Sequence, residues 1–168
     1  MRFVKEQWIE DVPRSRMIYP DTFLEKILYW VWSLYTPFHP YVRDVSTALR
    51  VVRHEGRQDF LIGTIHSSRS VQDLVSHLVT QGFGNHFVAW KDTDELVSLR
   101  RPDGFRRQYH VRIFTDGEVR GHYEYTPEYR PIQHLIQTGF EERTEEFKTL
   151  LQDWIVALPA PEQQSSVE

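Results

Sequence analysis

The spacing of hydrophobic residues changes along the chain, and each change predicts a different element. Across residues 70–82 the apolar positions follow a helical period, with a serine cap before them and a glycine after them. The apolar stripe consists of Val71, Leu74, Val75, Leu78 and Val79, with Ser70 as the cap and Gly82 as the stop. We therefore expect a central amphipathic helix that packs on a sheet.

Segments typical of β-strands follow this helix. They are residues 85–90, 95–101, 105–114 and 118–125. Short turn sequences rich in Asp, Gly and Pro separate them, so we expect a four-stranded antiparallel meander. Upstream, residues 46–67 contain β-branched and aliphatic residues on both sides of Glu55 and Gly56, which predicts an additional hairpin that turns there.

An aromatic helix is expected near the N-terminus, over residues 21–35. It begins at residues that favour a helix start, and from residue 27 onward it is apolar on nearly every side. We interpret it as a helix buried against the sheet. Two alternatives remain open: a partner or dimer surface that uses Trp30 and Trp32, and docking at a membrane interface.

Helices are also expected after the meander. Residues 126–139 predict a short helix that stops at Gly139, and residues 141–158 predict a longer one. The longer helix would bury the stripe Phe147, Leu150, Leu151, Trp154 and Leu158. Together these elements predict a single α+β domain over 1–158, followed by a disordered tail over 159–168.

Composition and charge narrow the class of protein. The chain has 168 residues, 40% hydrophobic and 26% charged, which suits one globular domain. It has no cysteine, so thiol catalysis, zinc–thiolate sites and disulfides are excluded. The net charge of −4 argues against a protein that coats nucleic acid through bulk charge. We see no secretory signal and no transmembrane segment, and expect a cytoplasmic protein.

The turn sequences predict which side chains share a face of the meander. A three-residue loop at 115–117 aligns apolar residues across the strands, and a similar loop at 102–104 puts Arg100 opposite Arg106. The core face then holds Val97, Leu99, Phe105, Tyr109, Val111, Ile113, Val119, Gly121 and Tyr123. The opposite face holds Ser98, Arg100, Arg106, Gln108, His110, Arg112, Arg120, His122 and Glu124.

The opposite face is the candidate site. It sets Arg112 opposite Arg120 and His110 opposite His122, and like charges across a strand pair cost about 0.2–1 kcal/mol. Such pairs make sense if an anion lies between them, because arginine binds phosphate through two parallel hydrogen bonds. We therefore predict an anion-binding face whose ligand is a phosphate-containing molecule or single-stranded RNA.

The sequence leaves open whether this face is catalytic. In a metal-independent ribonuclease or phosphodiesterase without a cofactor, Glu124 would act as general base and His110 or His122 as general acid. The substrate-binding residues would be Ser98, Arg100, Arg106, Gln108, Arg112 and Arg120. Alternatively, the same face binds RNA or another anionic ligand without chemistry.

Two other interpretations stay open. His110, His122 and Glu124, with His86, resemble a metal-binding set, although the neighbouring arginines would repel a cation. In the structural interpretation the face is ordinary solvated sheet, and its arginines pair with acids of the C-terminal helix. Those acids are Glu141, Glu142, Glu145 and Glu146.

Overall fold

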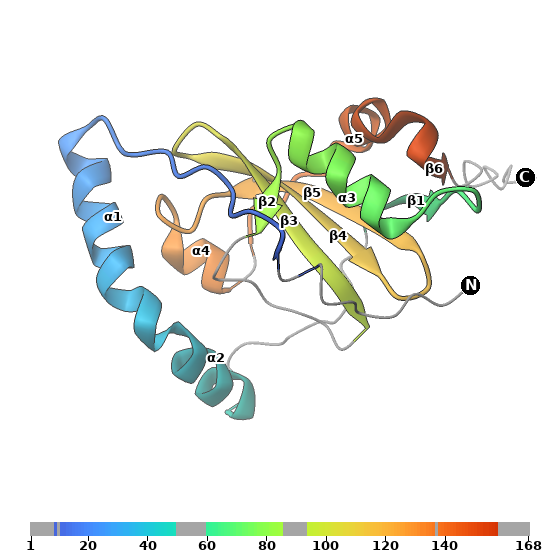
Figure 1. The fold of residues 1–168 in the computed structure, drawn as a ribbon. Helices are drawn as coiled ribbons and strands as arrows, with labels where there is room; N and C mark the ends of the chain where they lie inside the picture. The colour runs from blue at the N-terminus through green and yellow to red at the C-terminus, as the bar shows by residue number, and fades with distance from the viewer. Residues whose placement is uncertain (1–8, 10, 50–59, 86–93, 137, 158–168) are drawn as a thin grey trace, which may run out of the picture.

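The computed structural model describes residues 9, 11–49, 60–85, 94–136 and 138–157 (Figure 1). Its helices are α1 (Phe23–Tyr35), η2 (Thr36–Phe38), α2 (His39–Ala48), α3 (Val71–Thr80), α4 (Pro131–Leu135), α5 (Thr144–Leu151) and η3 (Gln152–Trp154). Its strands are β1 (Leu61–Ile65), β2 (Gly84–Asn85), β3 (Glu95–Asp103), β4 (Arg107–Phe114), β5 (Glu118–Tyr125) and β6 (Ile155–Ala157).

The strands form one six-stranded antiparallel sheet in the order β2-β3-β4-β5-β1-β6. Strands β2 to β5 are neighbours in chain order, as expected for a meander joined by short turns. The prediction of an α+β fold with a four-stranded antiparallel meander is confirmed, although residues 86–90 of its predicted first strand lie outside the described residues. No helix in the described residues has the length and apolarity needed to cross a membrane.

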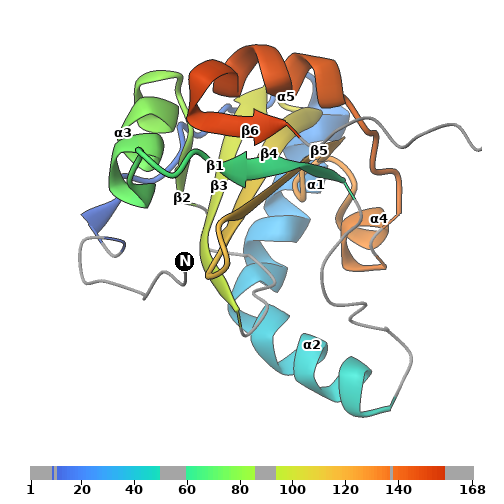
Figure 2. The same cartoon turned by 90° about the vertical axis from the view of Figure 1, so that its right-hand side faces the viewer.

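Helices lie on both sides of the sheet. In two views at right angles, α3 and α5 lie on one side, and α4 lies on the other with α1 and α2 farther out (Figures 1 and 2). Both faces of the central strands are therefore covered, which is unusual for an antiparallel meander with one polar face.

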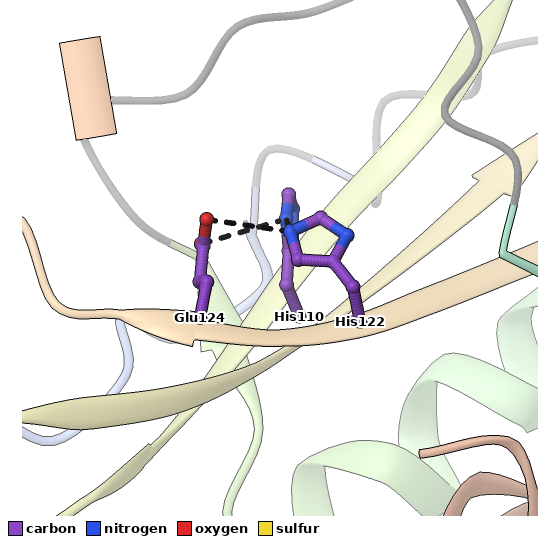
Figure 3. A group of neighbouring side chains, drawn as sticks. All are labelled: His110, His122 and Glu124. Atoms are coloured by element: carbon purple, nitrogen blue, oxygen red, sulfur yellow. Dashed lines mark hydrogen bonds and ion pairs between the residues drawn. The ribbon is translucent and has the colours of Figure 1, made fainter. Parts of the chain in front are cut away.

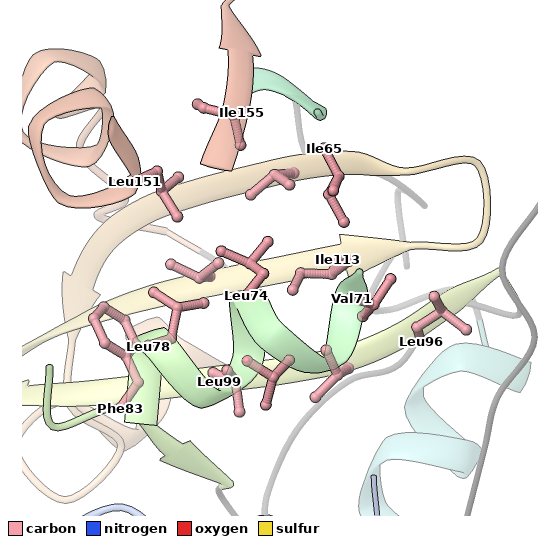
Figure 4. Packing of buried hydrophobic residues seen from close by; sticks show 14 of the residues in the cluster. Ile65, Val71, Leu74, Leu78, Phe83, Leu96, Leu99, Ile113, Leu151 and Ile155 are labelled. Carbon is pink, nitrogen blue, oxygen red and sulfur yellow. The ribbon is translucent and has the colours of Figure 1, made fainter. Parts of the chain in front are cut away.

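The hydrophobic core lies between the sheet, α3 and α5. Side chains of β3 and β4, among them Leu99 and Ile113, contact the stripe of α3, which contains Leu74 and Leu78 (Figure 4). The α3 prediction is confirmed at both ends: the Ser70 hydroxyl accepts from the Asp73 amide, and Gly82 has φ +87°.

A close approach fixes α5 on the same face. A Cβ on Gly121 of β5 would lie 2.8 Å from the Ile62 side chain and 2.9 Å from the Phe147 ring. Any larger residue here would force the Ile62 side chain or the Phe147 ring to move. The acidic C-terminal helix therefore covers the apolar face of the sheet, so the open interpretation in which its acids pair with the arginines of the polar face does not hold.

The C-terminal helix is shorter than predicted. It ends at Leu151, and after a 3-10 turn residues 155–157 form β6, which pairs with β1. Gln152 at the end of α5 has φ +35°, which stops the helix, and the β-branched Ile155 and Val156 suit an edge strand. Leu158 and the predicted tail lie outside the described residues.

The predicted hairpin of residues 46–67 is described only in part. Its second arm is β1, which pairs with β5 and β6. The first residues of the other arm, 46–48, belong to α2, and the turn near 55–56 lies outside the described residues. Strand β1 therefore extends the sheet beyond β5, the last strand of the meander.

The register of the meander matches the prediction in one hairpin and differs in the other. Between β4 and β5, His110 lies opposite His122 and Arg112 opposite Arg120. Between β3 and β4, however, Arg100 lies opposite His110, because the loop consists of residues 104–106. The shift is even, so every strand residue stays on its predicted face.

Two residues assigned to that second hairpin move as a result. Phe105 is in the loop and its ring lies 6.5 Å from the Tyr29 ring of α1, so its placement in the core was wrong. Arg106 is also in the loop, exposed, and is not opposite Arg100.

Candidate functional site: a buried histidine and carboxylate cluster

The polar face of the sheet is buried rather than solvated. We name as the polar cluster Ser98, Arg100, Gln108, His110, Arg112, His122 and Glu124, all of which are less than 6% exposed. The covering residues come from segments outside the meander. The Phe140 ring lies 4.6 Å from that of His122, the Phe60 ring lies 6.2 Å from it, and His134 of α4 contacts Glu124.

Glu124 of β5 is the centre of the cluster, and its two oxygens have different partners. Arg100 Nη1 and Gln108 Nε2 both donate to Oε1, at 3.1 and 2.9 Å. Oε2 lies 3.3 Å from His122 Nε2 and 3.5 Å from His134 Nδ1. One oxygen is therefore held by the arginine and the amide, and the other faces imidazole nitrogens.

The histidines of adjacent strands converge on the same point. His110 Nδ1 lies 3.1 Å from His122 Nε2, and both rings turn toward Glu124 (Figure 3). The other nitrogen of His110, Nε2, is 2.6 Å from Ser98 Oγ. The antiparallel register produces this arrangement, because His110 and His122 are directly opposed and Glu124 is the next residue on the same face.

Burial and neighbouring charges set the protonation of the cluster. Burial lowers the pKa of His110 well below its ordinary value, and the charge of Arg100 adds to this. Burial lowers the pKa of His134 to about 4. For Glu124 burial acts to raise the pKa, but Arg100, His134 and His122 together outweigh it and hold the pKa well below the usual range. At neutral pH the Glu124 carboxylate is therefore ionised, and the His110 and His134 imidazoles are neutral.

The remaining arginines of the face have carboxylate partners. Arg112 donates through Nε to Glu95 Oε2 at 3.0 Å, and Arg120 donates through Nη2 to Glu118 Oε2 at 2.8 Å. Glu95 reaches the polar face because the register of β3 is irregular between Glu95 and Val97, which places Glu95 opposite Phe114. The opposed arginines are therefore each neutralised within the sheet.

Arg106 does not belong to this cluster. It donates through Nε to Glu25 Oε1 of α1 at 2.8 Å, and 61% of its side chain is exposed. The predicted partner residues of α1 also separate: Trp30 is 62% exposed, whereas Trp32 is 2% exposed and its ring contacts Tyr35 and His39. Two residues apart on a helix point to different sides, so Trp32 was wrongly placed on a partner surface.

Sequence reasoning missed two residues of the site. Glu95 was missed because simple strand alternation puts it on the core face with Val97, and the irregularity between these two residues is not visible in the sequence pattern. His134 gave no usable signal, because its contact with Glu124 depends on how residues 126–136 fold back over the sheet. His86, proposed as a further metal ligand, lies outside the described residues.

The cluster has the composition and spacing of a metal site. One ligand atom each from His110, His122 and Glu124 lie within 4.8 Å of one another. Bonds of about 2.0–2.1 Å to a tetrahedral zinc ion put neighbouring ligand atoms about 3.3 Å apart. The 3.1 Å between the imidazole nitrogens and the 3.3 Å from His122 Nε2 to Oε2 are close to this separation, whereas His110 Nδ1 lies 3.8 Å from Oε1.

Phosphate or RNA binding by this face stays a prediction. The arginines expected to bind the anion contact Glu95, Glu118 and Glu124, so an anion would compete with three carboxylates. Comparison with protein family models, curated proteins and solved structures found no match to the chain. The function is therefore argued from the geometry of the polar cluster.

Proposed function

We propose that the chain binds a divalent transition-metal ion through His110, His122 and Glu124. The single observation that supports this is the convergence of two imidazole nitrogens and a carboxylate oxygen within 4.8 Å at a buried point. Two histidines and one carboxylate form a donor set used for zinc and iron(II), and cobalt(II) substitutes for zinc with the same ligands.

The surroundings of the three ligands support the proposal. Metal ligands are commonly oriented by a hydrogen bond to their other polar atom. Ser98 makes this contact to Nε2 of His110, and Arg100 with Gln108 makes it to Oε1 of Glu124. The positive charge of Arg100 is thus directed at Oε1, which leaves Oε2 for the cation.

His134 is the fourth donor that we assign. Its Nδ1 is 3.5 Å from Oε2 of Glu124 and is a buried nitrogen without a hydrogen-bond partner. Three imidazoles and one carboxylate complete a tetrahedral site. Since the side chains of His110, His122 and Glu124 are at most 6% exposed, we propose a closed, structural centre that holds α4 against the sheet.

The test measures metal retention by the intact protein. The chain is unfolded in the presence of a chelator, so that any bound metal is removed, and is then refolded with Zn²⁺ or Co²⁺. After free ion is separated, the bound metal is counted by elemental analysis. We expect one ion per chain, visible absorption bands of four-coordinate Co²⁺, and a higher melting temperature with Zn²⁺. At a free metal concentration of 100 times Kd the stabilisation is about 2.7 kcal/mol.

Matched variants show where the ion binds. Glu124→Gln and His122→Ala should lose it, whereas His66→Ala, which changes an exposed histidine bonded to Ser68, should retain it. A wild-type protein that refolds without metal, retains none and melts at the same temperature with Zn²⁺ would overturn the proposal. Equal loss in His66→Ala would show adventitious binding.

The same protein tests the predicted phosphate ligand. Inorganic phosphate and a short single-stranded RNA are added while the imidazole signals of His110 and His122 are followed by NMR. Saturable shifts caused by phosphate in metal-free protein would support an anion site in place of the metal centre. Shifts caused only by Zn²⁺ or Co²⁺ would support the metal centre.

A further inference from the structure

An apolar stripe runs along the outer side of the helices that precede the sheet. On α1 its exposed residues are Phe23, Ile27, Trp30 and Leu34. They follow one another at intervals of three or four, so they lie on one side of the helix. Trp32 and Glu25, which are buried, face the protein from the other side.

The stripe continues without a gap in the chain. η2 and α2 follow α1 directly, and their exposed apolar residues include Phe38, Tyr41 and Val45. These keep the same interval of three or four from Leu34. We name the seven residues from Phe23 to Val45 the helical stripe. Figure 1 shows α1 and α2 as a continuous arc at the periphery of the molecule, away from the sheet.

The area of the helical stripe is that of a protein interface. Phe23 is 80% exposed, Trp30 62%, Phe38 63% and Tyr41 73%. An aromatic side chain presents about 150–250 Å², so these four expose roughly 400–700 Å² before the aliphatic residues are added. The largest apolar patch of a monomer is about 300–600 Å², and a stable complex buries about 800 Å² on each partner.

The sequence of the stripe is complementary to itself. If two copies pack their stripes antiparallel about a twofold axis at Leu34, Phe23 meets Val45, Ile27 meets Tyr41 and Trp30 meets Phe38. The residues nearest the axis, Trp30, Leu34 and Phe38, then face apolar residues of the other copy. Such mutual contact of one surface with itself is the arrangement of twofold-symmetric dimers.

The charges beside the stripe differ from those of a membrane-docking helix. Exposed charges of both signs accompany the stripe, among them Lys26 and Asp44. A helix that docks on an anionic membrane would instead carry a row of basic residues on its polar side.

We propose that the helical stripe is the interface of a homodimer in which α1 and α2 of two copies pack antiparallel. The inference is independent of the metal centre, because Trp30 and Leu34 face away from the polar cluster. The dimer would bury a surface that a monomer leaves in water.

The first experiment measures mass by sedimentation velocity across a range of protein concentrations. We expect a monomer–dimer equilibrium for the wild type, and a weakening of at least about 30-fold for Trp30→Glu, as for a central interface aromatic. Ile132→Glu changes an equally exposed residue of α4 and should leave the equilibrium unchanged. A wild type that stays monomeric at all concentrations overturns the proposal.

The second experiment tests the geometry. Because the chain has no cysteine, Leu34→Cys introduces a single thiol at the proposed twofold axis. Oxidation should join two copies through it, whereas Ile132→Cys should remain unlinked. A dimer in which neither Leu34→Cys cross-links nor Trp30→Glu dissociates would place the interface elsewhere. A monomer that instead sediments with phosphatidylcholine and phosphatidylserine vesicles would assign the stripe to membranes.

Discussion

Buried ion pairs are the unusual feature at the scale of single residues. Arg112 and Glu95 face each other in the polar cluster with almost no solvent contact, since their side chains are 5% and 0% exposed. Burial removes the hydration of both charges, and each charge is stable there only while the other is present. Such a pair adds little net stability over a well-packed apolar pair, but it is costly to break.

We expect Glu95→Leu or Arg112→Met alone to lower the free energy of unfolding by about 3–5 kcal/mol, because each leaves a buried charge without its counterion. The double variant Glu95→Leu/Arg112→Met should recover most of this loss. Urea unfolding measures all three. If the losses of the single variants simply added in the double variant, the two charges would not be coupled.

The sequence predicted the faces of these residues better than their surroundings. Strand alternation and the loop at 115–117 place Arg112 and His122 on one face, and the structure agrees. Whether that face meets water depends on Phe140 and His134, which reach it from a segment whose path no local pattern encodes. Strand alternation therefore predicted which residues share a face, but not that other segments cover that face.

At the scale of elements, the unusual feature is the way in which α1 is attached to the rest of the fold. Glu25 accepts from the Thr22 amide and hydroxyl in the capping box that begins the helix, and its other oxygen accepts from Arg106. One carboxylate thus caps α1 and links it to the β3–β4 loop. These hydrogen bonds, that of Arg106 first, lower the pKa of Glu25 from its ordinary value of 4.5.

A lowered pKa means that the ionised carboxylate stabilises the folded state above the unfolded pKa, and that this stabilisation is lost as the pH falls through the folded value. We expect the wild type to be more stable than Glu25→Gln above pH 4.5, and the difference to shrink below that pH. Urea unfolding of both proteins at several pH values measures it. A difference that stays constant with pH would show that the charge of Glu25 is unimportant.

Glu145→Gln is the matched control for this experiment. Glu145 pairs with Lys148 at 2.7 Å, but its side chain is 86% exposed, and surface pairs contribute about 0–1 kcal/mol.

Elements also differ in how well the sequence predicts them, depending on whether their signals are local. α3 carries its own cap, stripe and stop, whereas β6 is a strand because Ile155 and Val156 pair with the distant β1.

The molecule as a whole has a stable centre and a more weakly attached helical arm. β4 is hydrogen-bonded on both edges and covered on both faces, whereas α1 contacts the remainder of the chain through one side only. Amide exchange with solvent follows local stability. We expect β4 amides to exchange most slowly and α1 amides much faster at low protein concentration, as measured by mass spectrometry.

The same measurement connects the arm to self-association. If two copies pair through the helical stripe, exchange in α1 and α2 should slow as the concentration rises, while that of β4 should not change. Exchange in α1 that is as slow as in β4 in the most dilute sample would contradict this division of stability.

The ends of the sheet also limit how copies of the chain can meet. β2 has two residues and β6 has three, and the outer side of β2 is occupied by Pro13 and Ser15, which bond to Asn85. Within the described residues, β2 itself therefore offers few free backbone groups on which a neighbouring chain could add a strand. If the helical stripe pairs as proposed, the two helical arms close on each other, and assembly through this surface is limited to two copies.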